Sequence, residues 1–247
     1  NYITSGSDEI MVVEADEYDR SFLQIHPDIA VISAMDPDHL DIYGNHGEMA
    51  NSFTDFAGNI KPSGKLIIRD GLDIQLRNDI RRIDYAVNEF SEISARNLVI
   101  KEGWQHFDIF SCEFHIPDVK LLIPGRHNVE NSLAAFAIAR QLGVPKEKII
   151  EGLGSFTGVR RRFDFRIRRP DQVYIDDYAH HPEELKAFIS AVRQLFPGKK
   201  LTGLFQPHLY SRTRDFAEGF AESLDMLDEI WLLDIYPARE LPIPGVN

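Results

Sequence analysis

Short apolar runs that end in acidic residues are the feature that most limits how this chain folds. Ile10 to Val13 and Ile29 to Met35 are two such runs. A strand buried on both faces reads as continuously apolar, so both runs predict buried parallel strands. Helical spacing follows from Gly47 to Ile60, and Lys65 to Ile68 begins another strand. Strands that alternate with helices predict parallel βαβ units and therefore an α/β fold.

The pattern changes in the middle of the chain. Residues 83 to 123 alternate in places and carry little helical signal, which predicts a small antiparallel patch beside the parallel sheet. Helical spacing returns at roughly 127–142 and 145–153.

A domain boundary is expected near Gly152 to Gly158. Three glycines fall within these seven residues, and three arginines follow at 160–162. We therefore expect one domain over residues 1–158 and a second over residues 159–247. The second repeats the α/β alternation, with elements expected at Val173–Asp176, Pro182–Leu195, Leu201–Phe205, Arg212–Leu224 and Ile230–Ile235.

Composition excludes several classes of protein. The 247 residues carry a formal net charge of −12, which argues against a nucleic-acid binder, because such proteins need a basic face for phosphates. No apolar run approaches the length of a membrane span, so no membrane contact is expected. The single cysteine, Cys112, cannot form a disulfide within the chain and fits a reducing compartment.

Two groups of candidate ligands follow the first two predicted strands. Their members are Glu14, Asp16, Glu17 and Asp19, and then Asp36, Asp38, His39 and Asp41. Parallel strands bring such loops to one edge of a sheet, where clustered carboxylates repel unless a cation lies between them. Oxygen ligands suit Mg²⁺. The alternative is a set of solvated loop acids and helix caps.

A third candidate group lies at a predicted helix start, between the strand-like run Val119–Ile123 and an alanine-rich helical run. It contains His127, Asn128 and Asn131. Asn128 and Asn131 are three residues apart, so they share one face of the first turn, where amides can read a purine ring. Helix capping by Asn128 explains the pattern equally well.

The second half holds two further strand-to-helix junctions, Asp176–Pro182 and Gln206–Arg214. They place His180 and Arg212 where a carboxylate or phosphate would bind, and arginine offers a fixed fork for such oxyanions. The alternatives are a solvated helix face for Arg212 and Arg214, and a helix-start histidine for His180. The phosphate-cradling loop G-x-x-x-x-G-K-[ST] is absent from the 247 residues.

Taken in order, these motifs resemble the Mur ligase family, the ATP-dependent enzymes that build the peptide of bacterial cell walls. The matching segments are Glu14–Glu17, Asp36–Asp41, Gly125–Asn131, Arg161–Phe163, Asp176–Pro182, Gln206–Thr213 and Tyr236–Glu240. The resemblance implies a central P-loop-type ATPase domain over residues 1–158 and part of a Rossmann-like, amino-acid-binding domain over residues 159–247. It also implies that a sugar-nucleotide domain and the phosphate loop precede Asn1, so this chain alone is expected to be inactive.

The resemblance further implies a reaction and a set of roles. The motifs are most similar to those of members that join L-alanine to UDP-N-acetylmuramate through an acyl phosphate, using ATP and Mg²⁺ in the cytoplasm. No obligate protein partner is implied. The implied roles are metal binding by Glu14 and His39; nucleotide binding by His127, Asn131, Arg162 and Asp177; and amino-acid binding by Tyr178, His180 and Arg212.

Two departures from the family pattern accompany the match. No lysine lies between His39 and Lys61, where several relatives carry a carbamylated lysine, and Leu209 stands where some relatives have arginine. Two alternatives stay open: a recycling ligase that attaches murein tripeptide to the same sugar nucleotide, and a non-catalytic nucleotide-binding module. The motif Gln206–His208 and the uninterrupted run Ser21–Asp28 favour the alanine-adding enzyme.

Overall fold

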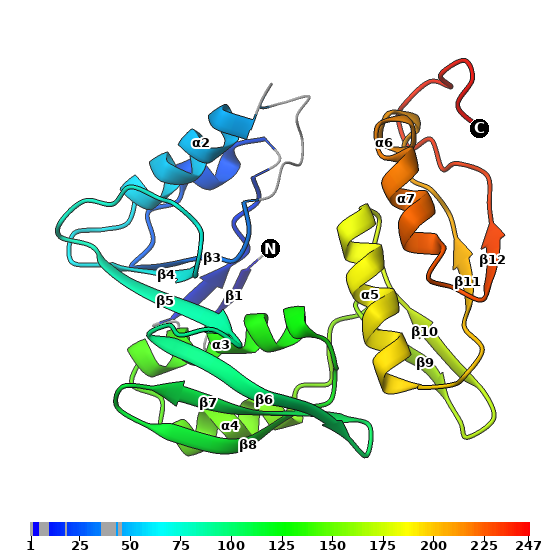
Figure 1. The fold of residues 1–247 in the computed structure, drawn as a ribbon. Coiled ribbons are helices and arrows are strands. Elements are labelled where there is room, and N and C mark those ends of the chain that lie inside the picture. Colours follow the sequence, from blue (N-terminus) through cyan, green and yellow to red (C-terminus); the bar gives the residue numbers. More distant parts are fainter. Residues whose placement is uncertain (1, 5–9, 18, 36–42, 44–45) are drawn as a thin grey trace. The chain divides into compact units, whose positions relative to one another are not determined.

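The structure is a computed structural model that describes residues 2–4, 10–17, 19–35, 43 and 46–247 (Figure 1). The chain divides into two compact units, each described by itself. The first unit comprises Asn1–Ala95, Phe110–Phe114 and Glu130–Pro145, and the second comprises Arg96–Ile109, His115–Val129 and Lys146–Asn247. The expected domain boundary between residues 158 and 159 stays a prediction.

The largest sheet has six strands in the order β3-β4-β5-β6-β7-β8. They are β3 (Ile29–Ile32), β4 (Lys65–Arg69), β5 (Arg81–Val87), β6 (Ile93–Lys101), β7 (Trp104–Ser111) and β8 (His115–Leu121). Neighbouring strands from β3 to β6 pair in parallel, with Ile67 of β4 opposite both Val31 and Ile83. Ile67 is fully buried, as the continuously apolar sequence of β4 predicts. The mixed α/β fold and the two predicted strands β3 and β4 are therefore confirmed.

The expected antiparallel patch over residues 83–123 is wrong at its start. β5 pairs in parallel with β4, and Tyr85 lies opposite Ile93 in a second parallel pairing. Only Glu102 and Gly103 join β6 to β7, and both have positive φ, at 52° and 81°. A two-residue turn of this kind joins antiparallel strands, so the antiparallel part begins at β6 and β7. Alternation could not show this, because side chains alternate in parallel and antiparallel strands alike.

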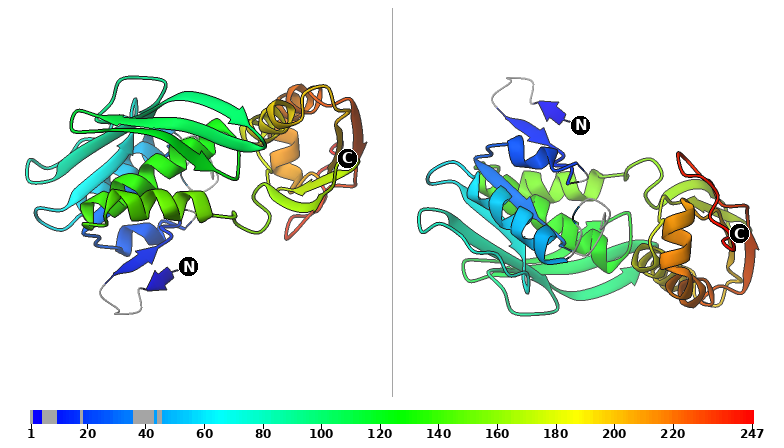
Figure 2. Two further views of the ribbon diagram at one scale, coloured as in Figure 1. Left: turned by 90° about the horizontal axis from the view of Figure 1, so that it is seen from below. Right: turned by 90° about the horizontal axis from the view of Figure 1, so that it is seen from above.

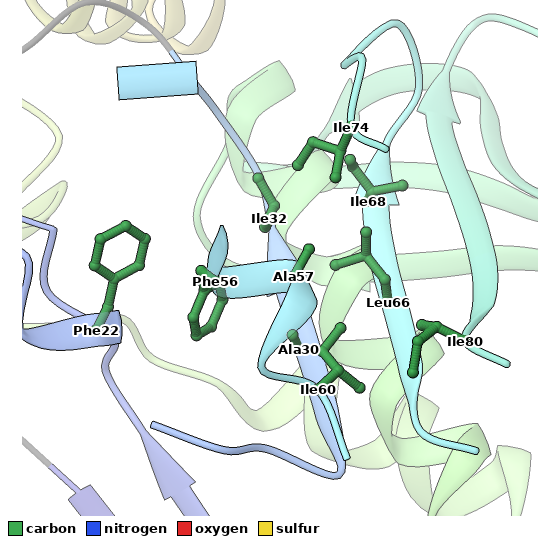
Figure 3. Packing of buried hydrophobic residues seen from close by; sticks show 10 residues of the cluster. All are labelled: Phe22, Ala30, Ile32, Phe56, Ala57, Ile60, Leu66, Ile68, Ile74 and Ile80. Atoms are coloured by element: carbon green, nitrogen blue, oxygen red, sulfur yellow. The ribbon is translucent and has the colours of Figure 1, made fainter. Parts of the chain in front are cut away.

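Helix α2 (His46–Gly58) packs its apolar face on β3 and β4, close to the predicted range Gly47–Ile60. Figure 3 shows Ala57 of this helix near Ile32 and Leu66 of the two strands, and the ring of Phe56 on the side of Phe22. Phe22, from the short helix η1 (Ser21–Gln24), completes this side of the core with its ring 5.1 Å from that of Phe56.

Strand β2 (Met11–Val13) is not the buried parallel strand that its sequence predicts. It pairs antiparallel with β1 (Tyr2–Thr4), and 62% of Met11 and 57% of Val12 are exposed. An apolar run shows that a strand is suited to burial, whereas burial itself depends on which elements cover the strand. A two-stranded ribbon covers neither of its own faces.

Two helices confirm the predicted ranges in the middle of the chain. α3 (Arg126–Gln141) and α4 (Lys146–Ser155) each begin and end within two residues of the expected positions. Within the second unit, α4 packs against β8.

Strand β10 (Val173–Asp176) lies where it was expected, but its partner β9 (Asp164–Arg168) was missed. The two strands are antiparallel, with Asp176 opposite Asp164, so β10 does not show the parallel pairing that was predicted. The sequence of β9 did not predict a strand because most of its residues are charged. One face of the strand is nevertheless apolar, and Phe165 on that face packs with Ile175. Its charged residues alternate with that face, as the period of a strand requires.

The remaining elements of the second unit lie near their predicted positions, with one exception. They are α5 (Pro182–Leu195), β11 (Thr202–Phe205), α6 (Tyr210–Asp215), α7 (Ala217–Leu224) and β12 (Glu229–Leu232). β11 and β12 are parallel, as predicted, and α5 and α7 lie side by side (Figures 1 and 2). The single helix predicted over Arg212–Leu224 is wrong, because Phe216 leaves helical geometry, with φ −117° and ψ 19°. Its ring packs 4.6 Å from the ring of His181.

None of the helices in the described residues combines the length and the apolar character that crossing a bilayer requires.

Candidate functional site

The loop after β2 is held by hydrogen bonds to its own backbone. Asp19 accepts a hydrogen bond from the backbone N–H of Ser21 at 2.9 Å, and hydrogen bonds with Ser21 lower the pKa of Asp19. Tyr43 donates its hydroxyl to the carbonyl of Glu17 at 2.6 Å. This hydrogen bond links Tyr43 to the first acidic loop.

The predicted metal ligands are only half described. Glu14 lies directly after β2 and is exposed, and its carboxylate has the oxygen chemistry that Mg²⁺ requires. His39 and its neighbours Asp36, Asp38 and Asp41 lie outside the described residues. Among the residues that are described, no three His, Cys, Asp or Glu side chains form a group that could hold a metal ion. The metal site therefore stays a prediction.

The start of α3 is built on Gly125. Its φ of 117° disfavours an L side chain, and a Cβ there would lie 2.9 Å from the His127 ring. Asn128 donates its side-chain amide to the carbonyl of Pro124 at 2.9 Å. The alternative of helix capping by Asn128 is therefore wrong, because an N-capping side chain accepts a hydrogen bond from a backbone N–H. His127 and Asn131 are both exposed and lie four residues apart on α3.

Asp177 fastens the arginine-rich loop to the end of β10. Its carboxylate accepts the backbone N–H of Phe163 at 2.7 Å and that of Ala179 at 2.8 Å. The N–H of Tyr178 donates to the carbonyl of Arg161 at 2.8 Å. Burial raises the pKa of Asp177, and the two backbone hydrogen bonds act in the opposite direction. These contacts give Asp177 a positioning role for the loop that carries Arg162.

Glu184 lies at the centre of the junction between β10 and α5. Its Oε2 accepts the N–H of His180 at 2.9 Å, and its Oε1 lies 3.7 Å from Nη1 of Arg162. With His181 as N-cap, it forms a capping box that starts α5 at Pro182. The ring of His180 lies 5.1 Å from that of Tyr178. The junction thus brings together the predicted residues Arg162, Tyr178 and His180.

A second acid holds the helix that carries Arg212. Glu240 accepts hydrogen bonds from the hydroxyl and the backbone N–H of Ser211 in the first turn of α6. Burial alone would raise the pKa of Glu240, but the hydrogen bonds from Ser211 and the charge of Arg212 lower it. The N-cap residue Leu209 has a φ of 71°, and its N–H donates to the carbonyl of Tyr236 at 2.9 Å.

His208 links this helix to the preceding junction. Its ring stacks on Tyr236 with centroids 5.5 Å apart. Burial lowers the pKa of His208, and the charges of Arg212 and His180 lower it further, while Glu240 raises it. His180 and Arg212 therefore both lie within electrostatic reach of His208, which follows the carboxyl end of β11.

Sequence reasoning missed Glu184 and Glu240 as organisers of this edge. The signal for Glu184 was present, because Glu three residues after His181, with Pro182 between them, forms a capping-box pattern. No local signal identifies Glu240, since its partner Ser211 lies 29 residues away.

Comparisons with known proteins place this geometry in a family. Residues 4–139 match the Mur ligase middle domain, and residues 161–242 match the Mur ligase, glutamate ligase domain. The first match alone covers more than half of the chain. This chain belongs to the Mur ligase family. The expected membership is confirmed.

Two curated relatives of this chain carry the same name. The UDP-N-acetylmuramate–L-alanine ligase of Flavobacterium psychrophilum is 50% identical over 247 residues, which are 100% of this chain and 54% of that protein. The ligase of the same name from Parabacteroides distasonis is 49% identical over 249 residues, again 100% of this chain and 54% of its own length. The chain spans about half the length of these relatives.

Solved Mur ligase structures agree with the fold. The crystal structure of the UDP-N-acetylmuramate–alanine ligase from Thermotoga maritima has a TM-score of 0.74 at 26% identity, covering 90% of this chain and 49% of that chain. The MurF ligase from Thermotoga maritima in complex with ADP has a TM-score of 0.73 at 21% identity, covering 87% and 50%. The second likeness concerns the fold alone.

Proposed function

We propose that this chain is the central and C-terminal part of an ATP-dependent ligase that joins L-alanine to UDP-N-acetylmuramate in peptidoglycan precursor synthesis. The observation that carries the proposal is 50% identity, over all 247 residues, to a ligase of that name. The γ-phosphoryl group of ATP would pass to the lactyl carboxylate, giving an acyl phosphate and ADP. The amine of L-alanine would then attack, form the amide and release phosphate.

The second unit would supply the amino-acid site. Arg212 offers a guanidinium fork for the carboxylate of L-alanine, and Glu240 supports this role by holding the helix that carries it. His180 and Tyr178 would line the same site. Positioning matters most in such a reaction, since aligned reactants lower the barrier without covalent help from the protein.

Three residues would contact the nucleotide, and a fourth would act through one of them. His127 and Asn131 would contact the adenine nucleotide from α3, and Arg162 would approach its phosphates. Asp177 supports Arg162 through the loop that it braces. Glu14 and His39 are proposed ligands of Mg²⁺, which would offset the negative charge of the phosphate and carboxylate oxygens. ATP and a UDP-sugar as substrates support a cytoplasmic location. We propose no nucleic-acid partner and no obligate protein partner.

The test uses the full-length protein that contains this chain. Phosphate release should require UDP-N-acetylmuramate, L-alanine, ATP and Mg²⁺ together, and Arg212→Ala should raise the KM for L-alanine more than it lowers kcat. The matched control, Arg214→Ala on the same helix, should leave that KM unchanged. Release with murein tripeptide but not with L-alanine would overturn the proposal in favour of the recycling ligase. No release with either would favour a binding module.

A further inference from the structure

An arginine-rich segment stands out from the acidic chain around it. The eleven residues from Val159 to Arg169 contain six arginines and one aspartate, whereas the whole chain has a net charge of −12. Neither the capping contacts nor the proposed ligase site uses most of these arginines. Their role needs a separate explanation.

The fold gathers three of these arginines around one cavity. Arg160 and Arg161 come from the loop before β9, and Arg166 comes from β9 itself. Together with Asp176 at the end of β10, they line a cavity of about 430 Å³. This volume is within the range of small-molecule pockets, but the lining is charged where such pockets are mostly apolar. The cavity is therefore suited to a hydrophilic ligand.

The charges around this cavity are not balanced within it. Arg166 Nη1 lies 3.2 Å from Asp164 Oδ2, so this cation has an acidic partner. The guanidinium of Arg161 lies 6.0 Å from the centre of the Tyr178 ring, which leaves its charge in place. For Arg160, the described residues provide no acidic partner within ion-pairing distance. Against three cations the cavity itself presents one carboxylate, Asp176. An anion would relieve the repulsion between the arginines.

The loop is held in place before any ligand arrives. Arg161 and Phe163 have positive φ, at 62° and 51°. Asp177 and the N–H of Tyr178 bind the backbone on either side of Arg162. Preorganisation of this kind reduces the entropy lost on binding.

Asp176 narrows the chemistry of the anion. A carboxylate in a binding site repels an anion unless that anion donates a hydrogen bond, because an ionised carboxylate only accepts. Hydrogenphosphate and sulfate are both dianions in a slightly alkaline buffer, but only hydrogenphosphate carries an O–H. We propose that Arg160, Arg161, Arg166 and Asp176 form a binding site for a phosphate-class dianion that bears a hydroxyl donor. The site shares no residue with the proposed ligase site, so neither proposal depends on the other.

The test is calorimetric titration of the 247-residue chain with inorganic phosphate and with sulfate at constant ionic strength. Phosphate should bind at least about tenfold more tightly than sulfate, the value of one charge-assisted hydrogen bond. Arg160→Ala and Arg166→Ala should each weaken phosphate binding by about tenfold or more. The matched control Arg169→Ala removes the same charge from the same segment, outside the cavity, and should leave the affinity unchanged.

Asp176→Asn tests the discrimination separately. An amide can donate to sulfate, so the preference for phosphate over sulfate should disappear while sulfate binding improves. Circular dichroism spectra would verify that each variant is folded. Absence of phosphate binding to the unaltered chain, equal affinity for the two anions, or an Arg169→Ala loss equal to that of Arg160→Ala would overturn the proposal.

Discussion

The strands β2 and β10 are both followed by acidic residues that were expected to carry chemistry, yet the two ends are built differently. After β2, Glu14 is exposed, and Asp19 binds the N–H of Ser21, two residues further along. After β10, Asp177 binds the N–H of Phe163, 14 residues away. The difference shows that an acid at a strand end can fix the backbone of a distant loop or lie exposed at the surface. The sequence pattern does not distinguish the two.

The largest expected effect is that of Asp177→Ala. It leaves the N–H groups of Phe163 and Ala179 without their acceptor, so the free energy of unfolding should fall by about 2–3 kcal/mol. Urea unfolding of the 247-residue chain measures this change. The matched variant Asp176→Ala should have a much smaller effect, and equal losses would show that Asp177 does not brace the loop.

Glu184→Ala should have the next largest effect. It removes the acceptor of the His180 N–H and the capping box of α5, so stability should fall by about 1 kcal/mol. Glu183 is an exposed acid in the same first turn, and Glu183→Ala should cost only a few tenths of that value, roughly the dipole contribution. A loss no larger than that of Glu183→Ala would contradict the capping role.

The pKa of His208 offers a finer test of the second unit. Because Arg212 lowers this pKa and Glu240 raises it, Arg212→Gln should raise it and Glu240→Gln should lower it. NMR titration of the His208 ring measures both shifts, and Arg214→Gln should leave the pKa unchanged. The folded pKa lies below the ordinary value of 6.5, so the unfolded chain takes up the proton first. The contribution of His208 to stability is therefore complete above that pH and is lost as the pH falls toward the folded pKa.

The smallest expected effect completes the comparison. Glu14→Ala should change the free energy of unfolding by less than about 0.5 kcal/mol, because Glu14 is exposed at the end of a two-stranded ribbon. Urea unfolding again provides the measurement. A loss as large as that of Asp177→Ala would mean that both strand ends are braced by their acids, and the distinction between them would fail.

The sequence predicted the individual helices and strands better than it predicted which strands pair and which are buried. The continuous apolar run of β4 and the amphipathic spacing of α2 and α5 are local properties, and the structure confirms them. The exposure of β2, the parallel pairing of β5 and the antiparallel pairing of β10 depend on segments distant in the sequence. The break at Phe216 reflects packing against His181, which outweighs a helical pattern.

The candidate site shows the same limit. Tyr178 and His180 flank one junction because they are neighbours in the sequence. Arg162 lies near them because it contacts Glu184, whose capping-box pattern is present in the sequence. Glu240 could not be found in this way, because a hydrogen bond spanning 29 residues leaves no periodic trace in the sequence.

The hydrogen bonds of Asp177 fix the backbone of the loop from Val159 to Phe163 without using the side chains of that loop. The hydrogen bonds that hold the loop from Val159 to Phe163 are accepted by Asp177 or run between backbone groups. Mutations at Arg160 or Arg161 can therefore change the side chains that the loop presents while its course stays the same. Within a family of related ligases, single substitutions in such a loop can change which ligand it binds. Each of the variants along the way still folds.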